Sequence, residues 1–411
     1  MTDVTLLDMP DLVMDKILKK LKIAYIMRLR KVCHALRDYI DTKPEYTIRR
    51  IKIEVHPSQI HTRLKFHSKT EITLIYQKQG NDCLYRVSNG LLVKYYLLKN
   101  KYFMNVFSGD IVDAVKNQNV PLHRLDIYGT YIECLLPFDF EPHVIEVKPN
   151  DSETSWTCSI LEFIGGFCKS NSSQNPVNSS DFDSDPDAPC PLKPTAAEFY
   201  TTFTRILKLR DRPIQIEELI ITIINKSDFL NMVPYIDIKN LGRLDISKMN
   251  YKNLIYNKVR MYFDELAELD GWEGIRSLNL NSLYMTLPFE RFFHMTGVYF
   301  PRENVTIEEI LYLKENRSKH FHALGNLLHQ FQVMLTTPHI SYFNFQYWTM
   351  EDADRVYSTL GVFRAGIEEK CWYYRIPDTD EVLGLSIDIF HIVSFSRMSA
   401  SEVPEGVVVM N

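Results

Sequence analysis

The sequence predicts a mixed α/β (α+β) protein: a three-helix block at the N-terminus, followed by a large domain of short, mainly parallel strands and helices. Apolar residues recur at helical spacing through about the first forty residues, and a short apolar-x-x-apolar-x-apolar pattern then returns along the chain. The chain has 411 residues, of which 45% are hydrophobic and 24% charged. That length and composition are typical of a protein with two or three domains, each with a buried core.

The N-terminal block is expected to consist of three amphipathic helices. Pro10 suits the first turn of a helix, where its missing N–H is not needed, and Pro44 ends the pattern. The apolar positions recur at Val13, Ile17, Leu18 and Leu21, at Ile26, Leu29, Val32 and Cys33, and at Leu36, Tyr39 and Ile40. A block this small buries too little apolar surface to be stable alone, so we expect it to lean on another surface.

The block resembles the F-box, the module that docks a substrate receptor onto the small adaptor subunit of SCF-type cullin–RING ubiquitin ligases. The resemblance rests on Met9-Pro10, on Ile17-Leu18 with Leu21, and on the run "LRKVCHALRDYI" at residues 29–40. Met9 stands where the usual Leu-x-x-Leu-Pro opening has its second leucine, and the Asp-Pro often found after Leu21 is missing. A plain helical bundle with the same periodicity is the alternative.

An F-box implies a set of residues that meet the adaptor. Periodicity does not separate the adaptor-facing positions from those inside the module, so the set includes both kinds. Its members are Leu6, Met9, Pro10, Ile17, Leu18, Leu21, Leu29 and Val32.

The larger domain is expected to be built on a recurring strand. The pattern occurs at Ile48, Ile51 and Ile53; Leu122, Leu125 and Ile127; Ile216, Leu219 and Ile221; Leu241, Leu244 and Ile246; Ile275, Leu278 and Leu280; and Ile340, Phe343 and Phe345. Strands with helical or looped returns resemble the leucine-rich-repeat unit, which implies parallel strands along an arc. The spacing between occurrences is irregular, and a mixed α/β domain without true repeats is the alternative.

Two helical returns and a closing set of strands complete the expected elements. The run at residues 195–209 places Phe199, Phe203, Ile206 and Leu207 on one face of a helix, and residues 306–331 predict one or two more helices. Residues 371–377 and 381–396 predict antiparallel strands around the turn at 377–380.

The second half resembles the FTH domain, which follows the F-box in a large nematode family. The residues that carry this resemblance are Glu268-Leu269-Asp270-Gly271-Trp272, Phe293-His294 and the run at 305–311. The resulting organisation is an F-box at 1–46, the first part of an α/β domain at 47–168, a disordered acidic loop rich in Ser, Asn and Pro at 169–195, an FTH-like domain at 196–400 and a tail at 401–411.

Composition argues against several partners and compartments. The formal net charge of -5 provides no surplus of cations for nucleic acid. The seven cysteines are scattered and form no metal or disulfide pattern, which favours reduced thiols in the cytoplasm or nucleus. No apolar segment is long enough to span a bilayer, so no membrane anchoring is expected.

A search for catalytic chemistry finds no convergent set. The sequence has no Gly-rich phosphate loop and no Gly-x-Ser-x-Gly elbow, so we expect no cofactor. His320 and His322 would point to opposite sides of a helix and share no metal, and Asp183 with Asp185 falls in the predicted loop. We interpret Cys33 as a buried apolar residue and Trp272 as a core anchor.

The two resemblances imply a non-catalytic substrate-recognition subunit of an SCF-type E3 ubiquitin ligase. It would bind the adaptor, and through it the cullin, by the F-box, and an unidentified target protein by the FTH-like domain. A regulatory scaffold that recruits the adaptor without ubiquitin transfer is the alternative. A hydrolase with an unrecognised site, the third candidate, would need an enclosed pocket with convergent titratable groups.

Overall fold

The computed structural model describes residues 9–21, 26, 29, 32–41, 43, 47–89, 93–116, 118, 120–130, 143–145, 192–249, 260–305, 342–350, 353–361, 363–366, 369–376 and 379–410. The chain divides into two compact units, Met1–Asp237 and Ile238–Asn411.

The first unit begins with helices α1 (Asp11–Lys20) and α3 (His34–Asp41). Between them, the described residues Ile26, Leu29 and Val32 are helical. Most of the predicted middle helix lies outside the described residues, so the three-helix arrangement is not confirmed.

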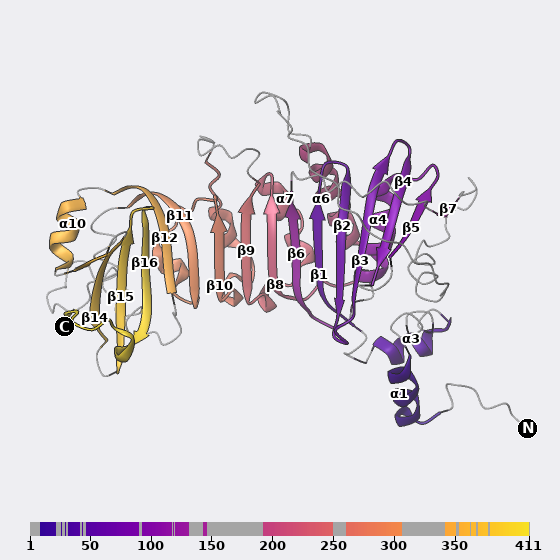
Figure 1. Ribbon diagram of the computed structural model, residues 1–411, viewed down its shortest axis with the longest axis horizontal. Helices are drawn as coiled ribbons and strands as arrows, with labels where there is room; N and C mark the ends of the chain where they lie inside the picture. The colour runs from indigo at the N-terminus through magenta and orange to yellow at the C-terminus, as the bar shows by residue number, and fades with distance from the viewer. Residues whose placement is uncertain are drawn as a thin grey trace, which may run out of the picture. The chain divides into compact units, whose positions relative to one another are not determined.

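The sheet of the first unit combines an antiparallel meander with parallel strands (Figure 1). Its strands are β1 (Ile48–Val55), β2 (Gln59–Phe66), β3 (Glu71–Gln79), β4 (Asp82–Ser88), β5 (Val93–Leu98), β6 (Leu122–Gly129), β7 (His143–Ile145) and β8 (Ile216–Ile223). Strands β1 to β5 pair with their sequence neighbours in antiparallel fashion. Strand β6 pairs in parallel with β1 and β8, and β7 pairs in parallel with β5.

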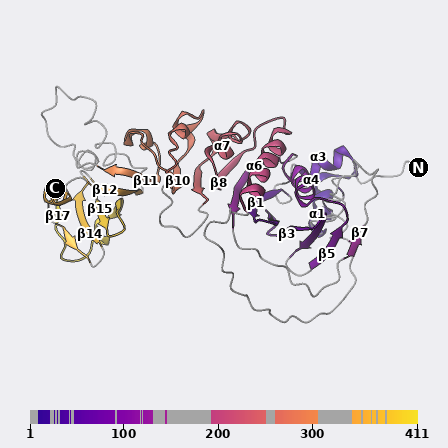
Figure 2. The same cartoon turned by 90° about the horizontal axis from the view of Figure 1, so that it is seen from above.

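Helices α4 (Phe103–Lys116) and α6 (Leu192–Lys208) cover one face of this sheet, as the two views show (Figures 1 and 2). Phe199 and Phe203 of α6 stack with ring centroids 5.6 Å apart, and Phe107 of α4 lies 5.6 Å from Phe199. Tyr76 meets Phe107 edge-on at 5.7 Å. The short helices α7 (Lys226–Leu230) and η3 (Val233–Tyr235) follow β8.

The second unit places four parallel strands beside an antiparallel set. Its strands are β9 (Arg243–Lys248), β10 (Ser277–Asn281), β11 (Gly297–Val305), β12 (Tyr342–Met350), β13 (Arg364–Ala365), β14 (Glu369–Arg375), β15 (Glu381–Asp388), β16 (Ile392–Ser399) and β17 (Val409–Met410). Strands β9 to β12 pair in parallel, in sequence order. Strand β16 pairs antiparallel with both β12 and β15, and β15 with β14.

The helices that the structure describes in the second unit are short. They are η4 (Ile238–Asn240), η5 (Asp264–Glu268), η6 (Trp272–Gly274), η7 (Phe289–Phe292), α10 (Ala353–Leu360) and η8 (Ala400–Glu402). The core is rich in phenylalanine: Phe289 lies 5.3 Å from Phe345 and Phe292 stacks on Phe300 at 4.8 Å, measured between ring centroids. Helix α10 is joined to β14 because the Tyr374 hydroxyl donates to the Leu360 carbonyl at 2.9 Å.

The recurring strand pattern is confirmed as strand structure. Its six occurrences fall on, or directly before, β1, β6, β8, β9, β10 and β12, and their described apolar residues are buried. The helix predicted at residues 195–209 is confirmed as α6. A mixed α/β fold is therefore shown.

Other expectations need correction. The strands are not mainly parallel, since β1 to β5 and β12 to β16 contain antiparallel ladders, and a repeat arc is not confirmed. Helix α6 begins at Leu192, so residues 192–195 of the predicted loop are helical, whereas 169–191 lie outside the described residues.

The run at 381–396 forms two strands rather than one. They are divided by a chain reversal at His391, which has a φ of 61°. The predicted tail contains β17, which pairs with β14. Residues 306–331 lie outside the described part.

Candidate functional site

Helix α1 separates its apolar residues into a buried side and an exposed side. Met14 and Leu18 are buried and lie four residues apart, one above the other on the same face. Leu12 is 67% exposed, and Val13 beside it is exposed as well. A helix with apolar side chains on its solvent side is typical of a surface that meets another protein.

Exposed apolar residues also occur in the sequence just before α1 and between α1 and α3. Met9 and Pro10 are exposed immediately before α1. Val32, two residues before α3, is 69% exposed. Met14, Leu18, Ile26, Leu36 and Ile40 are buried, whereas Cys33, predicted to be buried, is only half-buried.

A polar link joins α1 to α3. The Tyr39 hydroxyl donates to Asp15 Oδ1 at 2.8 Å and lies 2.9 Å from the Asp11 carbonyl oxygen. Lys43 Nζ lies 2.8 Å from the same Asp15 oxygen and 4.6 Å from the centroid of the Tyr39 ring. The two helices are therefore held together by a shared carboxylate as well as by apolar contact.

This link shifts the pKa values of Asp15, Tyr39 and Lys43. The hydrogen bond from Lys43 lowers the pKa of Asp15, and the Tyr39 hydroxyl contributes in the same direction. The hydrogen bond to Asp15 raises the pKa of Lys43, and desolvation raises the pKa of Tyr39. Asp15 and Lys43 are therefore both charged at neutral pH.

The residues expected to bind an adaptor occupy different environments. Met9, Pro10 and Val32 are exposed, and Ile17, Leu21 and Leu29 are half-buried. Leu18 is fully buried, which places it in the interior rather than on a surface. Leu6 lies outside the described residues.

Leu12 is a candidate that the sequence reasoning missed. It falls between the positions of the expected apolar face, and periodicity assigns such a residue to the solvated side. An apolar side chain on the polar side of a short amphipathic helix is the signal that could have found it.

Of the residues that carry the FTH resemblance, 268–272 and 293–294 form one local structure in the second unit, and 306–311 lie outside the described residues. Gly271 has a left-handed φ of 96°, which turns the chain so that Trp272 enters the core. The indole Nε1 of Trp272 donates to the Arg291 carbonyl at 3.0 Å, and Arg291 Nη2 donates to the Ala267 carbonyl at 2.7 Å. His294 Nε2 donates to the Trp272 carbonyl at 3.1 Å. Trp272 is thus confirmed as a core anchor.

Burial makes two of the described cysteine thiols, Cys83 and Cys371, poor nucleophiles. Burial raises the pKa of the Cys83 thiol to about 12, and burial also raises the pKa of Cys371. Both thiols are protonated at neutral pH, which disfavours nucleophilic attack. Asp183, Asp185, His320, His322 and His329 lie outside the described residues.

Comparison with protein families assigns two domains. A family model for the F-box domain matches residues 6–47, and one for the FTH domain matches residues 197–333. The chain therefore carries an F-box domain followed by an FTH domain. No curated protein and no solved structure matches the chain. In the part of the chain that the structure describes, no helix combines the length and apolar character needed to span a membrane.

Proposed function

We propose that this protein is the substrate-recognition subunit of an SCF-type cullin–RING E3 ubiquitin ligase. The F-box match over residues 6–47 supports this role, because F-box domains bind the small adaptor of such ligases and thereby the cullin. The observation that carries the proposal is the exposed apolar surface within that match. Such a surface has the chemistry of a docking site rather than that of a solvated helix.

The adaptor surface, as we define it, consists of Met9, Pro10, Leu12, Val13 and Val32. Ile17, Leu21 and Leu29 are half-buried and contribute at its rim, and Leu6 is retained from the sequence prediction. Leu18 is excluded from direct contact because its side chain is buried, and it acts by holding α1 in place.

The FTH-like domain is the proposed target-binding part. An FTH domain is associated with F-boxes, and the order of the two domains here resembles that of the nematode family named above. The chain would hold its target near the conjugating enzyme and so turn a bimolecular encounter into a local one. No catalytic group is needed for this role, and the free thiols of Cys33, Cys83 and Cys371 fit action in the cytoplasm or nucleus.

The direct test is a calorimetric titration of the purified full chain with the adaptor. We expect wild type to bind and Leu12→Asp to bind at least about tenfold more weakly, which corresponds to about 1.4 kcal/mol. The matched control is Leu209→Asp, which places the same charge at a 51%-exposed leucine after α6. Equal loss in both variants, or no binding by wild type, would contradict the proposal.

A further inference from the structure

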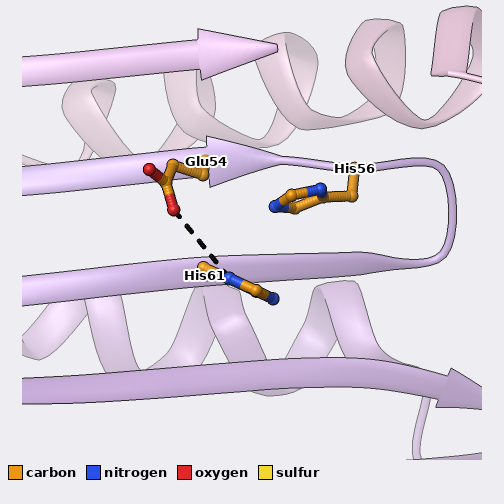
Figure 3. A group of neighbouring side chains, drawn as sticks. All are labelled: Glu54, His56 and His61. Atoms are coloured by element: carbon orange, nitrogen blue, oxygen red, sulfur yellow. Dashed lines mark ion pairs between the residues drawn. The ribbon is translucent and has the colours of Figure 1, made fainter. Parts of the chain in front are cut away.

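Three side chains with metal-binding chemistry meet where β1 turns into β2. Glu54 in β1 lies opposite His61 in β2, and His56 follows β1 by one residue. Residues 54 and 56 are two apart on extended chain, so their side chains point to the same face. Figure 3 shows the three side chains gathered on the hairpin, with the Glu54 carboxylate directed at His61. Neither the F-box match nor the FTH match includes them.

The donor atoms are close enough to share one ion. One donor atom from each residue lies within 4.8 Å of the donors of the other two. Glu54 Oε2 is 3.8 Å from His61 Nδ1, and the two imidazole centroids are 4.5 Å apart. A tetrahedral zinc ion with ligands at about 2.1 Å holds its donors about 3.4 Å apart. Side-chain rotations that move the donors by roughly 1 Å would therefore form the site.

Surrounding groups orient both histidines. His56 is buried, and its Nδ1 lies 2.7 Å from the Thr130 hydroxyl oxygen. A proton on Nδ1 that is donated to this hydroxyl leaves the Nε2 lone pair as the ligand, the arrangement that second-shell groups commonly impose. In His61, Nδ1 is the ring nitrogen that faces Glu54 Oε2 and so is the donor available to the shared ion.

The Glu54 side chain is 18% exposed, which gives an ion a route in from solvent.

Two cations oppose the binding of an ion. Lys52 Nζ lies 2.5 Å from Glu54 Oε1, and Arg63 Nη2 lies 3.9 Å from Glu54 Oε2. Lys52 pairs with the carboxylate oxygen that points away from His61, so Oε2 still faces the histidine. The Lys52 charge therefore reduces the affinity of the site while its geometry stays intact.

We propose that Glu54, His56 and His61 bind a divalent transition-metal ion that clamps the β1–β2 hairpin. Two imidazoles and one carboxylate match zinc, whereas magnesium and calcium favour oxygen ligands alone. Three protein ligands leave the fourth position of a tetrahedral ion to water.

The test is a titration of chelator-treated full-length protein with zinc, followed by calorimetry and by the unfolding temperature. We expect one equivalent to bind and the unfolding temperature to rise with zinc but not with magnesium. Glu54→Gln and His61→Gln should each weaken zinc binding by more than the 10–100-fold typical of second-shell changes. The matched control is His123→Gln, which removes an exposed histidine 2.8 Å from a carboxylate oxygen of Glu217 and should leave binding unchanged.

A further variant predicts a change in the opposite direction. Lys52→Gln removes the charge that competes for Glu54, so zinc should bind more tightly than in wild type. This gain does not depend on whether His61→Gln folds. The absorption spectrum of the cobalt-loaded protein distinguishes ligation by nitrogen and oxygen from ligation by cysteine thiolates, because thiolates add a sulfur charge-transfer band. The proposal is overturned if wild type binds no zinc, if sulfur ligates the cobalt, or if Glu54→Gln and Lys52→Gln both leave the affinity unchanged.

Discussion

At the scale of single residues, Gly271 in the second unit combines a left-handed φ with a close approach to Lys239. Its φ is +96°, and a Cβ added there would lie 2.8 Å from Lys239 Cγ and 2.9 Å from the Lys239 backbone nitrogen. A side chain therefore faces both backbone strain and a steric clash. The neighbouring Trp272 depends on this turn to reach the core.

We expect Gly271→Ala to lower the free energy of unfolding of the second unit by about 2 kcal/mol or more. Chemical denaturation followed by tryptophan fluorescence measures this loss. Gly406→Ala is the control, because Gly406 has a φ of +81° but nothing within 4 Å of an added Cβ. An equal loss in the two variants would show that the contact with Lys239 contributes nothing.

Two buried tyrosines of the first unit share one carboxyl group. The hydroxyls of Tyr76 in β3 and Tyr85 in β4 each lie 2.9 Å from Asp110 Oδ2 in α4. Burial, with the Asp110 charge second, raises the pKa of both tyrosines well above the usual value near 10. These bonds tie helix α4 to the sheet beneath it.

Tyr76→Phe should destabilise the first unit by about 1–2 kcal/mol at neutral pH, because it removes one buried hydrogen bond. Tyr102→Phe removes a similar 2.7 Å bond to Glu198 at an exposed position and should cost less. Urea denaturation of both variants measures the difference. A larger loss in Tyr102→Phe would contradict the role assigned to burial.

The same tyrosines predict a dependence on pH. A tyrosine whose folded pKa is raised keeps its proton in the folded state, while the unfolded chain releases it as pH exceeds about 10. Stability is therefore intact below pH 10 and falls above it. We expect the urea midpoint to fall as the pH rises from about 10 to about 12, and to fall less in Tyr76→Phe. A midpoint that is constant over this range would be inconsistent with the raised pKa values.

At the scale of elements, α1 combines a structural face and a docking face. Leu18→Ala removes a fully buried side chain and should lower the free energy of unfolding of the helical block by about 2–5 kcal/mol. The described residues between 9 and 41 should then exchange their amide hydrogens faster. Leu12→Ala removes an exposed side chain and should leave amide hydrogen exchange unchanged while it weakens binding to the adaptor. Hydrogen exchange by mass spectrometry reads out both variants. Fast exchange in Leu12→Ala would mean that this residue holds the helix rather than a partner.

Strands β1, β6, β8, β9, β10 and β12 could be predicted from the sequence because their buried positions repeat in a fixed order. Their pairing direction could not be predicted, because the same apolar pattern serves both directions. Strand β1 pairs antiparallel with β2 on one side and parallel with β6 on the other. This is the physical reason why the expectation of mainly parallel strands failed.

Helix α4 was not predicted, although its residues are well buried. Ser108 and Gly109 interrupt its centre, and Val106, Ile111 and Val115 are β-branched, so its residues have low helix propensity. Packing against the sheet and α6 stabilises the helix in spite of these residues. Such tertiary support is not visible in a local pattern.

The candidate site was predicted in part. Met9, Pro10 and Val32 were named from the F-box resemblance and are exposed. Leu12 was missed and Leu18 was included, because periodicity predicts a helix face but does not say which apolar residues the rest of the block covers.

At the scale of the whole molecule, the domains matched by sequence and the compact units differ in their bounds. The FTH match begins at residue 197, within α6, whereas the units divide between Asp237 and Ile238. Helix α6 packs on α4 and β1 of the first unit. Sequence resemblance therefore groups α6 and β8 with the following strands, while packing groups them with the preceding sheet.

This difference bears on how the protein should be divided for experiments. A fragment that begins at residue 197 would separate Phe199 of α6 from its partner Phe107 in α4 and would cut α6 within its first two turns. Full-length protein is therefore the appropriate material for binding studies of the target.

The most direct test of the central claim is to identify the proteins that co-purify with the full chain and with the double variant Met9→Ala and Pro10→Ala. Quantitative mass spectrometry should find both the SCF adaptor and the cullin with wild type, and neither with the variant, while circular dichroism shows that the variant remains folded. Capture of the adaptor without the cullin would favour a regulatory scaffold. Failure of wild type to capture the adaptor would contradict the role of ligase receptor.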